Sequence, residues 1–133
     1  MLKNSKKPTV KSLKRKLDRI FSEYIRRRDS QPDGYGHCCT CGKVLKWQDG
    51  DCCHFIRRAC NNTRFNEKNC NLGCRHCNRG GERNASYAAF LIERYGPNIL
   101  TELAELEHQT KRWFTWELEE LIEIYTKKLG ELK

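Results

Sequence analysis

The sequence has no run of about 18 apolar residues, which a membrane-spanning helix would need. Its first residues, MLKNSKKPTVKSLKRK, are basic but include no hydrophobic stretch of the kind found in secretory signals. Internal repeats and low-complexity segments are absent beyond this basic stretch. We therefore expect a soluble protein of the cytoplasm with no membrane partner.

The chain has 133 residues, which leaves no room for a second large domain, so we expect a single domain. The patterns described below predict an α+β fold that is mostly helical. Its expected segments are a flexible basic tail (1–11), a helix (12–29), a cysteine-rich core (37–83) and a helical C-terminal part (84–133).

Acidic side chains are scarce in the first part of the chain. The formal net charge is +9, and residues 1–48 alone hold 13 basic and 4 acidic side chains, whereas residues 84–133 are net negative. A basic excess concentrated on part of a domain is the usual footprint of nucleic-acid binding, because phosphate neutralisation releases counterions. The alternative is a solvated surface that only maintains solubility.

Residues 12–29 show helical periodicity, and Ser12 is the expected cap. Most basic side chains of this segment fall outside the apolar stripe, so they are free to face phosphate. The stripe itself forms part of the core or a partner contact. It consists of Leu13, Leu17, Ile20, Tyr24 and Ile25.

Two strand-like runs, Val44 to Trp47 and Asp51 to Ile56, flank the dipeptide Asp49-Gly50. This dipeptide is typical of tight turns with positive φ, so the runs predict a β-hairpin. Residues 57–69 are polar and are expected to form an irregular loop.

The acidic part of the chain is predicted to be helical. A first helix from Asn84 ends at Gly96-Pro97, a second starts at Asn98, and a third is capped near Thr115. The apolar face of the third helix is expected to pack within the chain, or else to form a dimer surface.

The nine cysteines are an odd number, and without a secretory signal they favour metal binding over a disulfide framework. Cys38 and Cys41 form one C-x-x-C pair, and Cys74 and Cys77 form a second. Two such pairs can supply the four thiolates of a tetrahedral zinc site, which would stabilise a small domain. Redox chemistry is the alternative. Cys39, Cys52, Cys53, Cys60 and Cys70 have no clear pairing and are interpreted as buried small hydrophobic residues.

His54 lies on the second expected strand, Asn69 lies in the loop before Cys74, and Asn78 follows Cys77 directly. In this order and within this cysteine framework, the three residues resemble the H-N-N form of the HNH superfamily, which has a zinc-stapled ββα-metal (His-Me finger) core. The runs HFIRR, TRF and NCNLGCRHCNRGG resemble more closely the phage NinG or Rap family of recombination endonucleases.

The resemblance, which covers roughly residues 16–97, implies metal-dependent cleavage of branched DNA, such as Holliday junctions and D-loops, during phage recombination. It also implies a ββα-metal core in residues 37–83. By analogy with junction resolvases of the endonuclease VII type, which make two cuts, we expect a homodimer. The sequence leaves open whether a recombinase partner recruits the protein.

His54 is the expected general base, since neutral imidazole can take a proton from water. By the resemblance, Asn78 holds a catalytic Mg²⁺ or Mn²⁺, ions that prefer oxygen ligands. Asn69 is expected to fix the loop and the His54 strand by hydrogen bonding. The alternative for His54 is an ordinary strand histidine or a zinc ligand.

Many superfamily members carry a metal ligand directly before the catalytic histidine, but this sequence has Cys53 there, a poor ligand for Mg²⁺. Asp51 is the substitute candidate, although on a regular strand it would point away from the side of His54. The alternative for Asp51 is a turn residue of the hairpin.

Arginines surround these positions in the sequence, and guanidinium groups bind phosphate oxygens bidentately. We therefore expect them to position DNA, although each alone could be a solvated surface residue. They are Arg57, Arg58, Arg64, Arg75 and Arg79. The remaining alternative for the whole chain is a zinc-dependent DNA-binding or regulatory module without catalysis.

Overall fold

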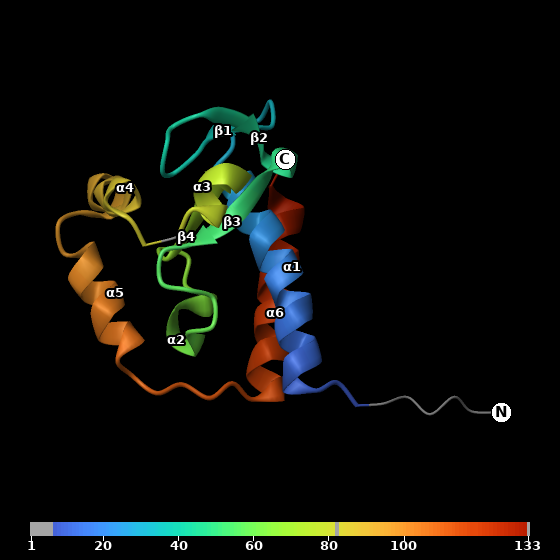
Figure 1. Ribbon diagram of the computed structural model, residues 1–133. Coiled ribbons are helices and arrows are strands. Elements are labelled where there is room, and N and C mark those ends of the chain that lie inside the picture. Colours follow the sequence, from blue (N-terminus) through green and yellow to red (C-terminus); the bar gives the residue numbers. More distant parts are fainter. Residues whose placement is uncertain (1–6, 82, 133) are drawn as a thin grey trace.

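The computed structural model describes residues 7–81 and 83–132 (Figure 1). Two long helices, α1 (Val10–Arg28) and α6 (Thr115–Glu131), lie side by side and form the largest helical contact of the fold (Figure 1). Between them Phe21 of α1 meets Tyr125 of α6 edge to face, with ring centroids 4.9 Å apart. The apolar face of α6 therefore packs within the chain, as predicted.

Helix α1 starts earlier than its apolar stripe predicted. Thr9 is the N-cap, and its hydroxyl accepts a hydrogen bond from the Ser12 backbone N–H at 3.0 Å, while the Ser12 hydroxyl accepts one from the Thr9 backbone N–H. Ser12 therefore closes a capping box from the third helical position and is not the cap itself. Of the predicted tail, residues 1–6 lie outside the described residues, and Val10 and Lys11 already belong to α1.

The predicted hairpin of residues 44–47 with residues 51–56 is wrong, because these two segments do not pair with each other. Strand β1 (Tyr35–His37) pairs antiparallel with β2 (Val44–Lys46), whereas β3 (Gly50–His54) pairs antiparallel with β4 (Cys70–Cys74). A 3-10 turn, η1 (Trp47–Asp49), separates β2 from β3.

Gly50 is not a turn residue with positive φ, because its φ of −104° is that of extended backbone. It is the first residue of β3. A Cβ at this position would lie 2.6 Å from Cδ1 of Leu72 and 3.0 Å from the Gly73 carbonyl oxygen. The glycine is therefore required for the close approach of β3 and β4 and not for a bend.

The predicted loop 57–69 contains a short helix, α2 (Asn61–Arg64), and leads into β4, a strand that is buried over its whole length. Helix α3 (Arg75–Arg79) follows β4 directly and packs on both strands of the β3–β4 sheet. Two strands and a helix thus form a small layer against α1 (Figure 1).

The acidic part of the chain folds as its local signals predict. Asn84 caps α4 (Ala85–Tyr95) by accepting a hydrogen bond from the Tyr87 backbone N–H at 2.9 Å, and Gly96 ends it with a φ of 98°. Helix α5 (Ile99–Glu107) then packs on α4. The two helices contribute to a core cluster separate from the one between α1 and α6. It consists of Cys39, Cys53, Phe55, Ile56, Tyr87, Leu91, Ile99 and Leu103.

The fold is a mostly helical α+β arrangement, as predicted, and its strands form two small antiparallel sheets. Across residues 7–81 and 83–132, no helix combines the length and the apolar character that a membrane crossing requires.

Candidate functional site

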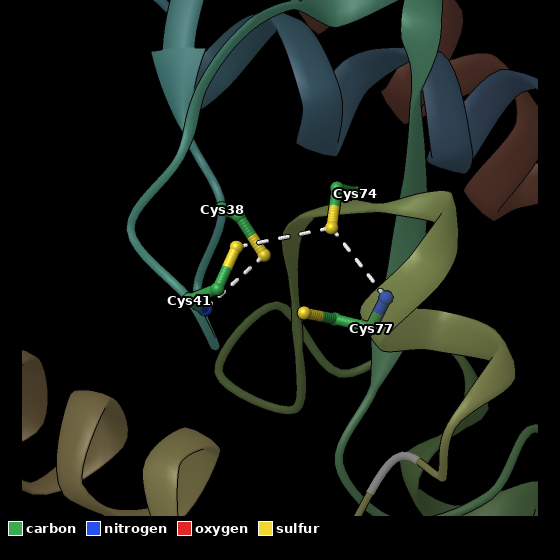
Figure 2. A group of neighbouring side chains, drawn as sticks. All are labelled: Cys38, Cys41, Cys74 and Cys77. Atoms are coloured by element: carbon green, nitrogen blue, oxygen red, sulfur yellow. Dashed lines mark hydrogen bonds between the residues drawn. The ribbon is translucent and has the colours of Figure 1, made fainter.

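The two C-x-x-C pairs meet in space, and their side chains point toward one another (Figure 2). Cys38 and Cys41 come from the turn after β1, Cys74 ends β4, and Cys77 lies on α3. The four sulfur atoms lie within 4.8 Å of one another, and the Cys41 and Cys74 sulfurs are 3.9 Å apart. Tetrahedral zinc with Zn–S bonds of about 2.3 Å places its sulfurs ~3.8 Å apart. The cluster could therefore hold a zinc ion.

Backbone N–H groups donate to two of the four sulfur atoms, those of Cys38 and Cys74. The Cys38 sulfur accepts hydrogen bonds from the N–H groups of Thr40 and Cys41 at 3.4 and 3.5 Å, and the Cys74 sulfur accepts one from Cys77 at 3.4 Å. Burial raises the pKa of Cys38, but these backbone donors lower it on balance to about 7. The thiolate form of Cys38, which is the form that binds metal, is thus accessible near neutral pH, whereas burial and neighbouring thiols raise the pKa values of Cys41 and Cys77.

A second feature is a cavity of about 760 Å³ beside the β3–β4 layer. Its wall is built by α1, β3, α3 and the segment that contains α2. Because these elements are far apart in the sequence, only the fold brings their polar side chains together. The lining residues are Asp18, Phe21, Ser22, Arg26, Gln48, Gly50, Asp51, Cys52, His54, Arg58, Ala59, Arg64, Arg75 and Asn78.

Asp51 and Asn78 both line this cavity and contact each other directly. The Asn78 side-chain Nδ2 donates a hydrogen bond to Oδ2 of Asp51 at 3.1 Å, and Arg75 Nε lies 3.8 Å from the other carboxylate oxygen. Within the described part of the chain nothing donates to the buried Oδ1 of Asn78. A carboxylate and an amide oxygen are the ligand types that hard divalent cations take, although in this structure the amide of Asn78 turns its Nδ2 and not its Oδ1 toward Asp51.

His54 lines the same cavity and is only 8% exposed. Its Nε2 lies 2.9 Å from the Arg64 carbonyl oxygen, which can only accept, so Nε2 carries the proton and Nδ1 keeps the lone pair. Burial lowers the pKa of His54 below its ordinary value of 6.5. The neutral imidazole is therefore favoured at neutral pH, with Nδ1 as the nitrogen that carries no proton.

Asp18 of α1 is a site residue that sequence reasoning missed. Its carboxylate accepts hydrogen bonds from Arg64 Nε at 3.1 Å and from Arg64 NH2 at 2.5 Å, and Arg58 lies 4.0 Å away. Asp18 thus anchors the segment whose carbonyl holds His54. The available signal was a lone acid among the basic residues of this part of α1.

Asn69 lies away from the cavity lining and is completely buried. Its Oδ1 accepts a hydrogen bond from the Ile56 N–H at 2.8 Å, and its Nδ2 donates to the carbonyls of Ile56 and Thr63 at 3.0 and 3.1 Å. Asn69 therefore ties the residues that follow β3 to α2, the helix that presents the Arg64 carbonyl to His54.

Only some of the remaining predicted residues line the cavity. Arg58, Arg64 and Arg75 line the cavity, whereas the exposed Arg57 and Arg79 do not. Cys53 points to the opposite side of β3, into the core beneath α4. Hydrogen bonding with the Cys39 thiol, together with burial, raises the pKa of Cys53. It is therefore held as a thiol and is no ligand for an ion in the cavity.

Residues 2–133 match the sequence profile of the family described as "Bacteriophage Lambda NinG protein". A curated relative, "Protein ninG" of Salmonella phage P22, is 30% identical over 123 residues, which cover 90% of this chain and 57% of that protein. The chain thus spans little more than half the length of this relative. No solved structure matches the chain. The chain belongs to the NinG family of bacteriophage proteins.

Proposed function

We propose that the chain is a divalent-metal-dependent endonuclease of the HNH type that cleaves branched DNA, such as Holliday junctions and D-loops, in phage recombination. The observation that carries the proposal is the cavity in which His54, Asp51 and Asn78 meet. A poised base, two oxygen donors and a basic rim are the parts that phosphodiester hydrolysis requires.

The oxygen donors fit Mg²⁺ or Mn²⁺. Asn78 Oδ1 is buried without a partner in the described residues, and the Asp51 carboxylate lies beside the same side chain. An ion bound to these oxygens would stabilise negative charge on the scissile phosphate and on the leaving oxygen. Both donors are hard, so they suit these ions better than they suit zinc.

The protein's own residues would perform the other steps. His54 takes the proton from the attacking water at Nδ1, because Nε2 is engaged with the Arg64 carbonyl. Arg58 and Arg75, which are both exposed, hold phosphate oxygens of the DNA. The Arg64 side chain is already paired with Asp18, so its role is to position the Arg64 backbone carbonyl, which accepts the hydrogen bond from His54. Asn69 supports the same segment through its hydrogen bond to the Thr63 carbonyl.

In this proposal β3, β4 and α3 form the ββα-metal core. Zinc on the four cysteines would hold the turn after β1 against the end of β4 and helix α3. The basic face of α1, which borders the cavity through Ser22 and Arg26, extends the DNA contact. Junction resolution needs two cuts, so the active form would be a homodimer in the cytoplasm of the host cell.

The test is cleavage of a synthetic four-way junction with Mg²⁺ or Mn²⁺, by protein that holds zinc on the four cysteines and from which excess zinc has been removed. His54→Ala should lower the cleavage rate by about 100- to 10,000-fold, which is the usual contribution of a general base, while junction binding persists. His108→Ala is the matched control, because His108 is exposed at the end of α5. If the wild type binds junctions but never cuts them with either ion, the chain is a non-catalytic zinc-dependent DNA-binding module.

Two matched variants test the assignment of Asp51 as a ligand of the catalytic metal. Asp51→Asn should weaken cleavage and raise the Mg²⁺ or Mn²⁺ concentration needed for half-maximal rate, because a ligand charge is lost. Asp49→Asn changes an exposed acid two residues away, in η1, and should do neither. Equal behaviour of the two variants would remove Asp51 from the proposed site.

A further inference from the structure

A second group of metal-ligating side chains lies outside the four-cysteine cluster. Cys52 and His54 alternate along β3, so they share one face of the strand, and Cys70 of β4 is the register partner of His54. The sulfur atoms of both cysteines and a ring nitrogen of His54 lie within 4.8 Å of one another. Sheet geometry alone therefore gathers two thiols and an imidazole at one point.

We propose that Cys52, His54 and Cys70 form a second, exchangeable site for a thiophilic divalent cation such as Zn²⁺ or Cd²⁺, and that the bound ion withdraws His54 from catalysis. The binding site stands on its own geometry, whereas the inhibitory effect rests on the proposed nuclease function. A metal-bound ring nitrogen has no lone pair for the attacking water, so occupancy would stop cleavage.

The distances fit such an ion after a small adjustment. Donor atoms around tetrahedral zinc lie ~3.8 Å apart at the sulfur positions, so donors within 4.8 Å need to approach by about 1 Å at most. Three protein ligands leave the fourth position open for water, as in catalytic zinc sites. The second ring nitrogen of His54 remains available for a carbonyl, and the Arg64 carbonyl is already hydrogen-bonded to this ring.

An ion can reach the site through the cavity. Cys52 is half-buried and lines the cavity together with His54, while Cys70 lies fully buried behind them. Mg²⁺ would not compete for this site, because thiolates are soft ligands and Mg²⁺ requires oxygen. The two kinds of ion would therefore bind at different places. Hard cations would bind at Asp51 and Asn78, and soft cations at the Cys52–His54–Cys70 group on the α1 side of β3.

Binding must displace the thiol protons to solvent. The fully buried Cys70 S–H points at the Arg64 carbonyl at 3.7 Å and would give up this contact when it binds an ion. The second site should thus be weaker than the four-cysteine cluster, because it offers three protein ligands and not four. Metal loaded at this site is expected to leave on dialysis against a mild chelator that does not strip the cluster.

The experiment measures Zn²⁺ and Cd²⁺ stoichiometry on the full chain, with thiolate charge-transfer absorption as the spectroscopic readout for Cd²⁺. The wild type should bind two equivalents, one of them removable by a mild chelator. Cys52→Ser should weaken the removable equivalent by at least about 100-fold and leave the other in place. Cys60→Ser is the matched control, because Cys60 is also half-buried but belongs to neither cluster.

Two outcomes overturn the site: a single equivalent in the wild type, or a second equivalent that survives both Cys52→Ser and Cys70→Ala. Circular dichroism with zinc on the four-cysteine cluster shows whether each variant is folded, and Cys52→Ser avoids the fully buried Cys70 position.

The inhibitory effect is tested separately. Excess Zn²⁺ should suppress junction cleavage in the wild type and in Cys60→Ser but not in Cys52→Ser, each compared with its own rate without added zinc. Equal suppression in all three would overturn the inhibitory effect. If no variant cleaves DNA, the nuclease proposal fails, and the stoichiometry still decides the metal site.

Discussion

Replacing Asn69 by alanine should destabilise the protein strongly. Asn69 is fully buried, and its amide satisfies the Ile56 N–H and two carbonyls. A buried group left without a partner costs about 1–3 kcal/mol. The Ile56 N–H would lose its acceptor outright, whereas the Thr63 carbonyl keeps a second donor, the Asn66 N–H at 3.2 Å. We therefore expect a loss of about 2–4 kcal/mol.

The assay is thermal and urea unfolding of the zinc-loaded protein. For a chain of this size, that loss corresponds to a decrease in Tm of about 8–16 °C. Asn69→Asp separates hydrogen bonding from packing, because a carboxylate of equal size still accepts from Ile56 but faces two carbonyls. Asn98→Ala is the control, since Asn98 is exposed and makes no capping hydrogen bond. A loss below about 1 kcal/mol for Asn69→Ala would refute the assigned supporting role.

Three further predictions concern the site and its frame. Because burial lowers the pKa of His54 below 6.5 and the neutral form is the base, cleavage should stay constant near neutral pH and fall only below pH 6.5; a midpoint at or above 6.5 in the rate profile would contradict this. Cys74→Ser should lose the tightly held zinc, measured by elemental analysis, whereas His54→Ala should keep it. Gly73→Ala should destabilise by about 1–3 kcal/mol in urea unfolding, because the added Cβ overlaps the Cys53 sulfur, whereas Gly130→Ala in α6 meets no atom and should not destabilise.

Local signals predicted the parts of the fold that depend on neighbours in sequence. The cap at Asn84 and the stop at Gly96 bound α4 as expected, because a helix end is decided by a few adjacent residues. The approach of Cys38 and Cys41 to Cys74 and Cys77 also followed from spacing, since each pair forms within one tight turn.

The strand pairing could not be read in the same way. Asp49-Gly50 has the composition of a hairpin turn, yet β3 pairs with β4 across a long connection that contains α2. Nothing adjacent to β3 in the sequence reveals that partner, because the preference comes from burial of β4 on both faces. Asp18 was missed for a similar reason: its role depends on Arg64, which only the folded chain brings near.

Strand geometry also explains how Asp51 and His54 can share one cavity although their side chains leave opposite faces of β3. Strand β3 has a ladder partner on one edge only within the described residues, and Gly50, Asp51, Cys52 and His54 all border the cavity. Because residues from both faces of β3 line it, the cavity is not confined to one face of the strand. The expectation that Asp51 would point away from the side of His54 assumed a site on one face only. Asp51 lies toward α3, where it accepts a hydrogen bond from Asn78, whereas Cys53 is buried in the core on the other side, so in the proposed site Asp51 and not Cys53 is the candidate metal ligand.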